Sequence, residues 1–76
     1  MAKYSVDLSN NLKEARKSMG LTQAELAERI DVSRKTINTI ENRIFVPSTI
    51  LALKLAHTLN RRVEELFKLD PEVKGE

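Results

Sequence analysis

The sequence predicts an all-α fold of five short helices in one domain of 76 residues. Two helix-start signals lie eleven residues apart, at Thr22 and Ser33. A third is Pro47-Ser48, because a proline ahead of a capping serine stops a helix from extending backwards. Apolar residues follow each signal with helical spacing, so every helix can turn one face towards a shared core.

The signal at Thr22 is a capping box. The Thr22 hydroxyl can accept a hydrogen bond from the N–H of Glu25, and the Glu25 carboxylate can reach back to the N–H of Thr22. We therefore expect one helix from Thr22 to about Ile30. A second, from Ser33 to about Asn42, should follow after a tight turn.

Helix 33–42 has two faces of different character. Ile37, Ile40 and Ile44 fall on the side that we expect to be buried. The other side carries Arg34, Lys35, Asn38, Thr39 and Asn42. Arginine and asparagine have planar donor and acceptor groups that match the edges of guanine and adenine in a major groove. The alternative is a solvated face, which would more often consist of glutamate and lysine.

The stretch LTQAELAERIDVSRKTINTIEN, residues 21–42, resembles the helix-turn-helix of the phage Cro/repressor-like (XRE-type) DNA-binding family. The similarity runs from about Leu12 through VPSTILALKLAHTLNRRVEELF, roughly four-fifths of the chain. It implies a lambda-repressor-like domain that lays helix 33–42 in the major groove. It also implies a small transcriptional regulator, a repressor, that binds double-stranded DNA as a homodimer on a palindromic operator.

The expected DNA contacts are of two kinds. Base edges are assigned to Arg34, Lys35, Asn38 and Thr39. Phosphates, which set the register without reading sequence, are assigned to Lys17, Gln23, Ser33, Asn42 and Arg43. Roles without DNA stay open for several of these: Ser33 can simply cap its helix, Gln23 can be ordinary helix filler, and the two cations can be solvent-exposed.

An arginine lies on the apolar side of the first helix, which should begin between Ser9 and Asn11 and end near Met19. A buried arginine needs a carboxylate. Glu41, equally out of place on the inner side of helix 33–42, is the candidate, and the family resemblance points to the same pair. We expect a salt bridge between Arg16 and Glu41.

The end of helix 33–42 departs from the family pattern. Relatives usually have glycine where Arg43 stands, because the chain leaves the helix there with a positive φ. Asn42 or Arg43 must therefore adopt that conformation, or the helix must end differently.

Helix 48–59 has two apolar stripes, of which a small domain can bury only one. Ile50, Leu53 and His57 form the second stripe, and an exposed apolar patch usually marks a partner surface. With helix 63–68, the candidate dimer contacts are Ile50, Leu53, Val63, Leu66 and Phe67. Simple packing between these two helices is one alternative. Another is an antitoxin or protein-interaction module that binds its partner through helix 48–59.

The two ends of the chain flank the domain, which we place at residues 9–69. Residues 1–8 alternate in character, which favours either a short strand paired with 67–69 or a disordered arm. The tail 70–76 carries three acids and one lysine, so residues 1–69 carry a net charge of about +4. That charge suits a polyanionic partner.

Several classes of function are disfavoured by composition. The chain has no cysteine and one histidine, so we expect no metal site and no cofactor. No nucleophile is paired with a base, so we expect no enzyme, and no small-molecule ligand is evident. Without a long apolar run or a signal peptide, the default location is cytoplasmic, away from the membrane.

Overall fold

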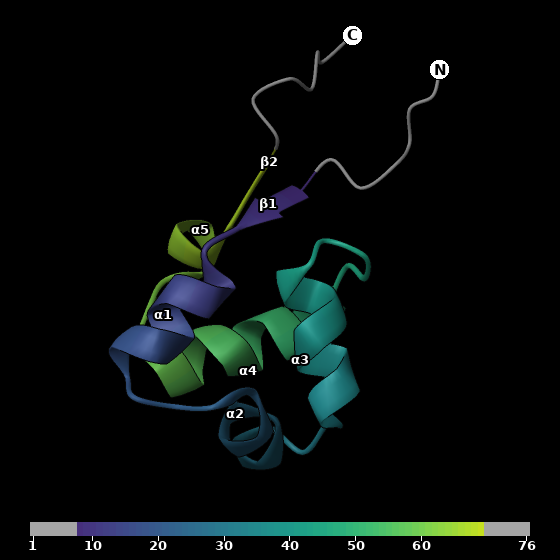
Figure 1. The fold of residues 1–76 in the computed structure, drawn as a ribbon. Helices are drawn as coiled ribbons and strands as arrows, with labels where there is room; N and C mark the ends of the chain where they lie inside the picture. Colours follow the sequence, from purple (N-terminus) through teal and green to yellow (C-terminus); the bar gives the residue numbers. More distant parts are fainter. Residues whose placement is uncertain (1–7, 70–76) are drawn as a thin grey trace, which may run out of the picture.

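The computed structural model describes residues 8–69, which form five helices and a two-stranded sheet. In chain order the elements are β1 (Leu8–Asn10), α1 (Leu12–Ser18), α2 (Gln23–Arg29), α3 (Arg34–Glu41), α4 (Thr49–Leu59), α5 (Val63–Leu66) and β2 (Phe67–Leu69). The two strands lie side by side at one end of the helices (Figure 1). The expected arm over residues 1–7 and the tail 70–76 lie outside the described residues.

The three predicted helix starts are confirmed. Thr22 Oγ1 accepts from the Glu25 N–H at 3.0 Å, and Glu25 Oε1 accepts from the Thr22 N–H at 2.9 Å, which completes the capping box of α2. The Ser33 and Ser48 hydroxyls accept from the backbone N–H three residues on, at 3.2 and 3.1 Å. These short contacts explain why α2, α3 and α4 begin where they do.

A left-handed residue follows each of α1 and α3. Gly20 has φ +72° after α1, and Arg43 with φ +63° is the residue that takes this conformation after α3. For a residue with a Cβ the left-handed region costs roughly 1–2 kcal/mol. The chain therefore leaves the helical path at Arg43. Ile44 is 69% exposed, so its expected burial is wrong.

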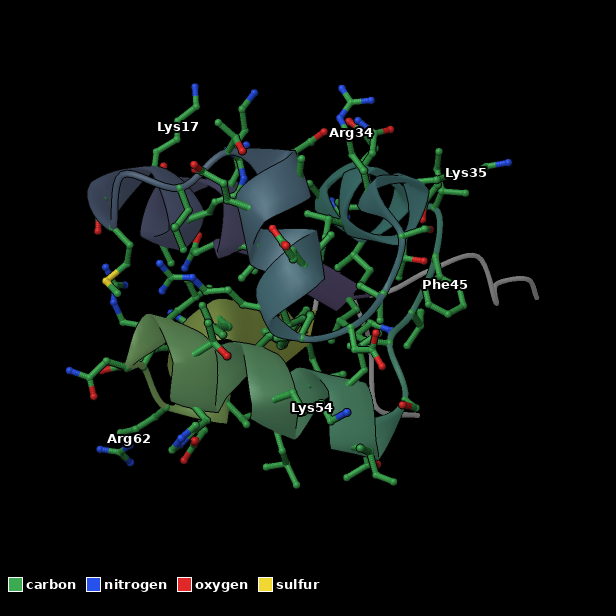
Figure 2. The ribbon with its side chains drawn as sticks, turned by 90° about the horizontal axis from the view of Figure 1, so that it is seen from below. Lys17, Arg34, Lys35, Phe45, Lys54 and Arg62 are labelled. Carbon is green, nitrogen blue, oxygen red and sulfur yellow. The ribbon has the colours of Figure 1, made fainter. Side chains whose placement is uncertain are left out.

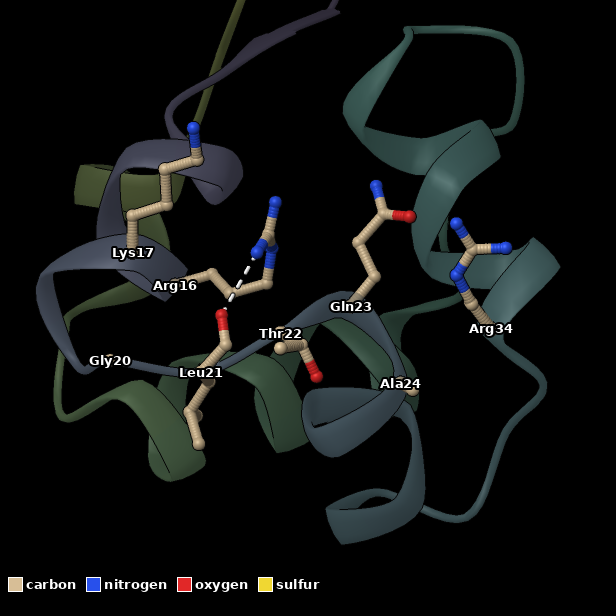
Figure 3. Close-up of a pocket in the computed structure, with 8 residues that line it drawn as sticks. All are labelled: Arg16, Lys17, Gly20, Leu21, Thr22, Gln23, Ala24 and Arg34. Atoms are coloured by element: carbon tan, nitrogen blue, oxygen red, sulfur yellow. Dashed lines mark hydrogen bonds between the residues drawn. The ribbon is translucent and has the colours of Figure 1, made fainter.

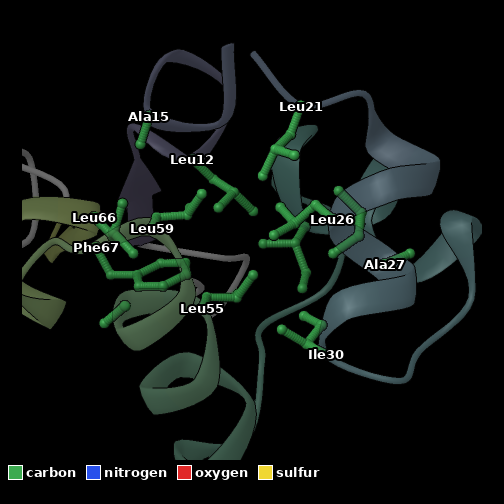
Figure 4. Packing of buried hydrophobic residues seen from close by; sticks show 13 residues of the cluster. Leu12, Ala15, Leu21, Leu26, Ala27, Ile30, Leu55, Leu59, Leu66 and Phe67 are labelled. Carbon is green, nitrogen blue, oxygen red and sulfur yellow. The ribbon is translucent and has the colours of Figure 1, made fainter. Parts of the chain in front are cut away.

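The core joins the helices around α4 (Figure 4). Its largest fully buried side chains are Leu12, Leu26, Ile37, Ile40, Leu55, Leu59 and Leu66. Among residues 8–69, Arg16 is the charged residue that is buried with this core. Met19, near which the first helix was expected to end, caps α1 and is exposed. Because Ile37 and Ile40 are anchored in this core, the opposite face of α3 points to solvent.

The last helix is shorter than the sequence predicts. It ends at Leu66, and Phe67 has the extended backbone angles φ −128° and ψ 133° that begin β2. Leu66 is fully buried and Phe67 is 9% exposed, because both pack into the domain's own core. Their assignment as dimer contacts is therefore wrong. Val63 is half-buried.

The predicted small sheet is present. β1 pairs antiparallel with β2, with Leu8 opposite Leu69 and Asn10 opposite Phe67. The first strand thus crosses the expected boundary at residue 8 and includes residues expected to start the first helix. The Asn10 amide nitrogen donates to the Ile40 carbonyl at 3.0 Å, which ties β1 to the last turn of α3.

Candidate nucleic-acid interface

Three cationic side chains project from one side of the molecule. In Figure 2, Lys17 of α1 and Arg34 of α3 point upward and Lys35 of α3 points to the right, all three from the upper part of the molecule, whereas Lys54 and Arg62 lie in its lower part. All five are exposed. The side that presents the outer face of α3 is therefore a basic surface, which attracts a polyanion.

The four expected base-reading residues share this surface. Arg34 and Lys35 are the first two residues of α3 and are exposed, and Asn38 and Thr39 follow one turn later and are half-exposed. They stand opposite the buried Ile37 and Ile40, so the core fixes the direction in which they point. The polar side chains of the first two turns of α3 are therefore accessible from solvent.

The expected salt bridge between Arg16 and Glu41 is present. Arg16 Nε lies 2.6 Å from Glu41 Oε2, and Nη2 lies 3.2 Å from Oε1. The third guanidinium nitrogen, Nη1, donates to the Leu21 carbonyl at 2.9 Å. Both side chains are less than 10% exposed. Arg16 therefore joins α1 to α3 and to the residue that leads into α2.

A chain of amides extends from this ion pair to the surface of α3. Gln23 Nε2 donates to Glu41 Oε1 at 2.9 Å, and Gln23 Oε1 accepts from Asn38 Nδ2 at 3.4 Å. Asn42 Nδ2 donates to Asn38 Oδ1 at 3.2 Å and to the Asn38 carbonyl at 2.9 Å. One base-reading candidate is thus linked to a buried carboxylate through the first residue of α2.

Other assigned side chains also have partners within the protein. The Thr39 hydroxyl donates back to the carbonyls of Lys35 and Thr36, both at 3.0 Å, so its donor is shared within α3. Ser33 caps α3, as described above. Arg43 Nε donates to the Leu8 carbonyl at 3.1 Å, which holds its side chain against β1.

Lys17 stands at the rim of an open hollow of about 450 Å³ between α1 and α3. Figure 3 shows Gln23 between Arg16 and Arg34, with its amide oxygen on the side of α3. Lys17 and Arg34 both line this hollow, on opposite sides of Gln23 in Figure 3. The arrangement leaves cations on both sides of the start of α2.

The expected partner surface on α4 is partly as predicted. Ile50 and Leu53 are 68% and 55% exposed, and with Lys54 and His57 they line an open groove of about 400 Å³. Val63 lies beside Leu53 in a smaller hollow of about 190 Å³. An apolar surface therefore remains once Leu66 and Phe67 are assigned to the core.

Between residues 8 and 69, no helix has both the length and the apolar character that a membrane crossing requires.

Two helices joined by a tight turn, the second anchored by its apolar face and exposed along its polar face, define a helix-turn-helix protein. The family model described as helix-turn-helix matches residues 12–66, more than half of the chain. This protein belongs to that family, in its XRE-type, DNA-binding branch of transcriptional regulators. Such a family is not a class of enzymes.

Two relatives are similar over most of their length. An uncharacterized HTH-type transcriptional regulator from Methanothermobacter thermautotrophicus is 48% identical over 60 residues, which cover 78% of this chain and 87% of that protein. The uncharacterized HTH-type transcriptional regulator YgzD of Bacillus subtilis is 37% identical over 65 residues, which cover 86% of this chain and 98% of that protein.

Solved structures share the fold. The restriction-modification controller protein C.AhdI from Aeromonas hydrophila superimposes with a TM-score of 0.67 and 31% identity, over 71% of this chain and 78% of that one. The SOS-response transcriptional repressor LexA from Eubacterium rectale gives a TM-score of 0.71 and 29% identity, over 87% of this chain and 69% of that one.

Two features of the site were missed in the sequence. The contacts of Gln23 with Glu41 and Asn38 join residues that are 18 and 15 positions apart, so no local pattern reveals them. The bond from Asn10 to the end of α3 spans 30 positions. The spacing of 38 and 42 on one helix face was the only available signal, and it indicates the Asn38–Asn42 contact alone.

Proposed function

We propose that this protein acts as a homodimeric repressor that reads a palindromic operator with α3 in the major groove. The observation that carries the proposal is the outer face of α3, where four polar side chains stand together on the basic side of the molecule. The buried Arg16–Glu41 pair and the isoleucines of α3 hold that face in one orientation. Rigid placement matters because base edges are read by directional hydrogen bonds.

The base contacts are divided by chemistry. Arg34 has the fork of donors that pairs with guanine O6 and N7, and Asn38 has the donor and acceptor that pair with adenine. Lys35 can donate to guanine, and Thr39 can offer its methyl group to a thymine. Each bidentate contact is worth about 1–3 kcal/mol of discrimination.

The phosphate contacts are assigned to Lys17, Ser33, Asn42 and Arg43, which border the base-reading face. Lys17 precedes α2 in the chain and Arg43 follows α3, and phosphate contacts from both would help to set the register along the DNA backbone. Gln23 stays in this set as well, because its NH₂ group has a second N–H beyond the one that it donates to Glu41. Binding should weaken as salt is raised, since each neutralised phosphate releases counterions.

The dimer contact is assigned to Ile50, Leu53 and Val63. One domain makes few base contacts, and specific binding generally needs the larger interface of two. Two copies with their α3 helices about 34 Å apart would read half-sites one turn apart. A protein partner on the same groove, as in an antitoxin, is the second candidate, because the exposed Ile50 and Leu53 fit either occupant.

A binding selection tests the DNA proposal. The purified protein is titrated against a pool of random duplexes at two salt concentrations, alongside Arg34→Ala and Lys54→Ala. We expect a palindromic motif whose preference Arg34→Ala relaxes at one position in each half-site. Lys54→Ala removes the same charge from the opposite side of the molecule and should leave the motif unchanged (Figure 2). Sequence-blind binding that moderate salt abolishes would contradict the proposal.

Sedimentation tests the dimer. The wild-type protein should sediment as a dimer, and Leu53→Glu should yield a folded monomer with weaker operator binding. Lys68→Glu, at an exposed position of β2 outside the groove, serves as the control for an added negative charge. A wild-type monomer that stays monomeric on DNA, with Leu53→Glu binding normally, would favour the protein-partner candidate instead.

A further inference from the structure

Gln23 occupies a junction between the buried ion pair and the DNA-facing surface. It is half-buried at the start of α2, with Arg16 on one side and α3 on the other (Figure 3). Its amide nitrogen donates to Glu41 at 2.9 Å, and its amide oxygen accepts from Asn38 at 3.4 Å. Within residues 8–69, no other side-chain hydrogen bond connects the ion pair to a base-reading residue.

The ion pair determines which group donates and which accepts in each hydrogen bond from Glu41 through Gln23 and Asn38 to Asn42. An ionised carboxylate can only accept, so Gln23 must turn its NH₂ group to Glu41 and its oxygen to α3. That oxygen requires the NH₂ group of Asn38, which leaves Asn38 Oδ1 on the side of the Asn42 amide. The oxygen and the NH₂ group of a side-chain amide are nearly the same in shape, so shape alone does not orient the amide. Here the negative charge of Glu41 selects the orientation.

We infer that Gln23 is a positioning residue that holds the Asn38 side-chain amide in one orientation and so gives Asn38 its preference for adenine. An asparagine amide has two N–H donors and two acceptor sites. Gln23 takes one donor and Asn42 takes one acceptor site, so one of each is left. A donor beside an acceptor is the pattern that adenine N6–H and N7 complement, whereas guanine O6 and N7 are both acceptors.

This inference rests on the proposed function and changes what is expected of one residue. A glutamine that only touched a phosphate would add the same affinity on every sequence. A glutamine that orients Asn38 instead acts at one base pair in each half-site. The two roles therefore differ in whether Gln23→Ala changes the ranking of sequences.

The first arm of the test measures base preference. Wild type, Gln23→Ala, Asn38→Ala and the double variant are titrated against the selected operator and against duplexes substituted at each position. A bidentate contact gives about a 5- to 150-fold preference. We expect Gln23→Ala to reduce the adenine preference severalfold at the position that Asn38→Ala also affects. In the double variant, Gln23→Ala should add no further loss there.

Lys17→Ala is the matched control, since Lys17 borders the same hollow without a place in the amide chain. It should weaken all duplexes by a similar factor. If Gln23→Ala behaves in the same way, with the adenine preference intact, the inference is wrong and the proposed function still stands. If the wild type shows no base preference at all, the proposed function itself fails, and the role of Asn38 as a reader fails with it.

The second arm needs no DNA. NMR relaxation of the Asn38 side-chain NH₂ group should report a restricted amide in wild type and a more mobile one in Gln23→Ala. Lys17→Ala should leave it restricted, and thermal unfolding should show that both variants are folded. An Asn38 amide that is equally restricted without Gln23 would overturn the inference.

Discussion

Breaking the Arg16–Glu41 pair should be among the most damaging single changes available in this domain. Glu41→Ala removes the acceptor of three hydrogen bonds, two from Arg16 and one from Gln23. It leaves a guanidinium whose side chain is 8% exposed with the Leu21 carbonyl as its recorded partner. Removing one partner of a buried pair typically costs about 3–5 kcal/mol, because the remaining charge stays buried.

That cost is large for a chain of this length. At about 0.05–0.15 kcal/mol per residue, the whole domain is expected to have roughly 4–11 kcal/mol of stability. In a domain of this size each 1 kcal/mol shifts the melting temperature by about 4–8 °C, so the loss corresponds to roughly 12–40 °C. Glu41→Ala should therefore be unfolded or close to it at 37 °C.

Urea unfolding followed by circular dichroism measures the effect. Arg16→Ala should cost a similar amount, whereas the double variant Arg16→Met/Glu41→Leu should recover most of the loss, because an apolar pair of similar volume leaves no uncompensated charge. A cost below about 1 kcal/mol for either single variant would place the pair in the range of surface salt bridges and refute the reasoning. A double variant no more stable than the singles would do the same.

Three further predictions concern the framework and are measured by the same unfolding experiment. Thr22→Ala should lose about 1 kcal/mol, because the capping box of α2 loses its hydroxyl, and an unchanged midpoint would argue against the cap. Leu66→Ala should cost about 2–5 kcal/mol of stability, because it truncates a core side chain. Leu53→Ala on the surface should change the stability of the monomer by no more than about 0.5 kcal/mol. A larger loss for Leu53→Ala than for Leu66→Ala would mean that Leu66 is a dimer contact after all. Gly20→Ala should cost about 1–2 kcal/mol through backbone strain at φ +72° alone, because the new Cβ meets nothing within 4 Å, and a neutral result would mean that this turn relaxes.

The features that the sequence predicted well are those set by neighbouring residues. The starts of α2, α3 and α4 depend on a hydroxyl and an N–H three residues apart, so they can be recognised in the sequence. Arg16 and Glu41 were identified differently, since each is a charge on an apolar face and two such residues need one another. In both cases a group that needs a partner, a helix N–H or a buried charge, had one suitable partner in the sequence.

The errors lie where the outcome depends on distant parts of the chain. Phe67 continues a helical pattern in the sequence, but β1 offers it a strand partner 57 positions away. Once paired, it turns into the core with Leu66, which removes both from the predicted dimer surface. Ile44 was misplaced because Arg43 adopts a left-handed conformation that the sequence left open. The amide chain through Gln23 needed the packing of α2 against α3.

Together these contacts describe one assembly in which the core, the ion pair and the amide chain hold α3 in a fixed orientation. α1 and α2 both bind Glu41, and β1 binds the last turn of α3 through Asn10. Three elements that lie far apart in the sequence therefore fix the position of the last turns of α3.

The most direct test of the central claim is to map the surface that DNA touches. Backbone amide shifts of the labelled protein are followed by NMR during titration with the selected duplex and with a scrambled one. We expect the largest changes across residues 34–42 and around Lys17 with the selected duplex, and smaller, salt-sensitive changes with the scrambled one. Changes confined to α4, or identical with both duplexes, would contradict it.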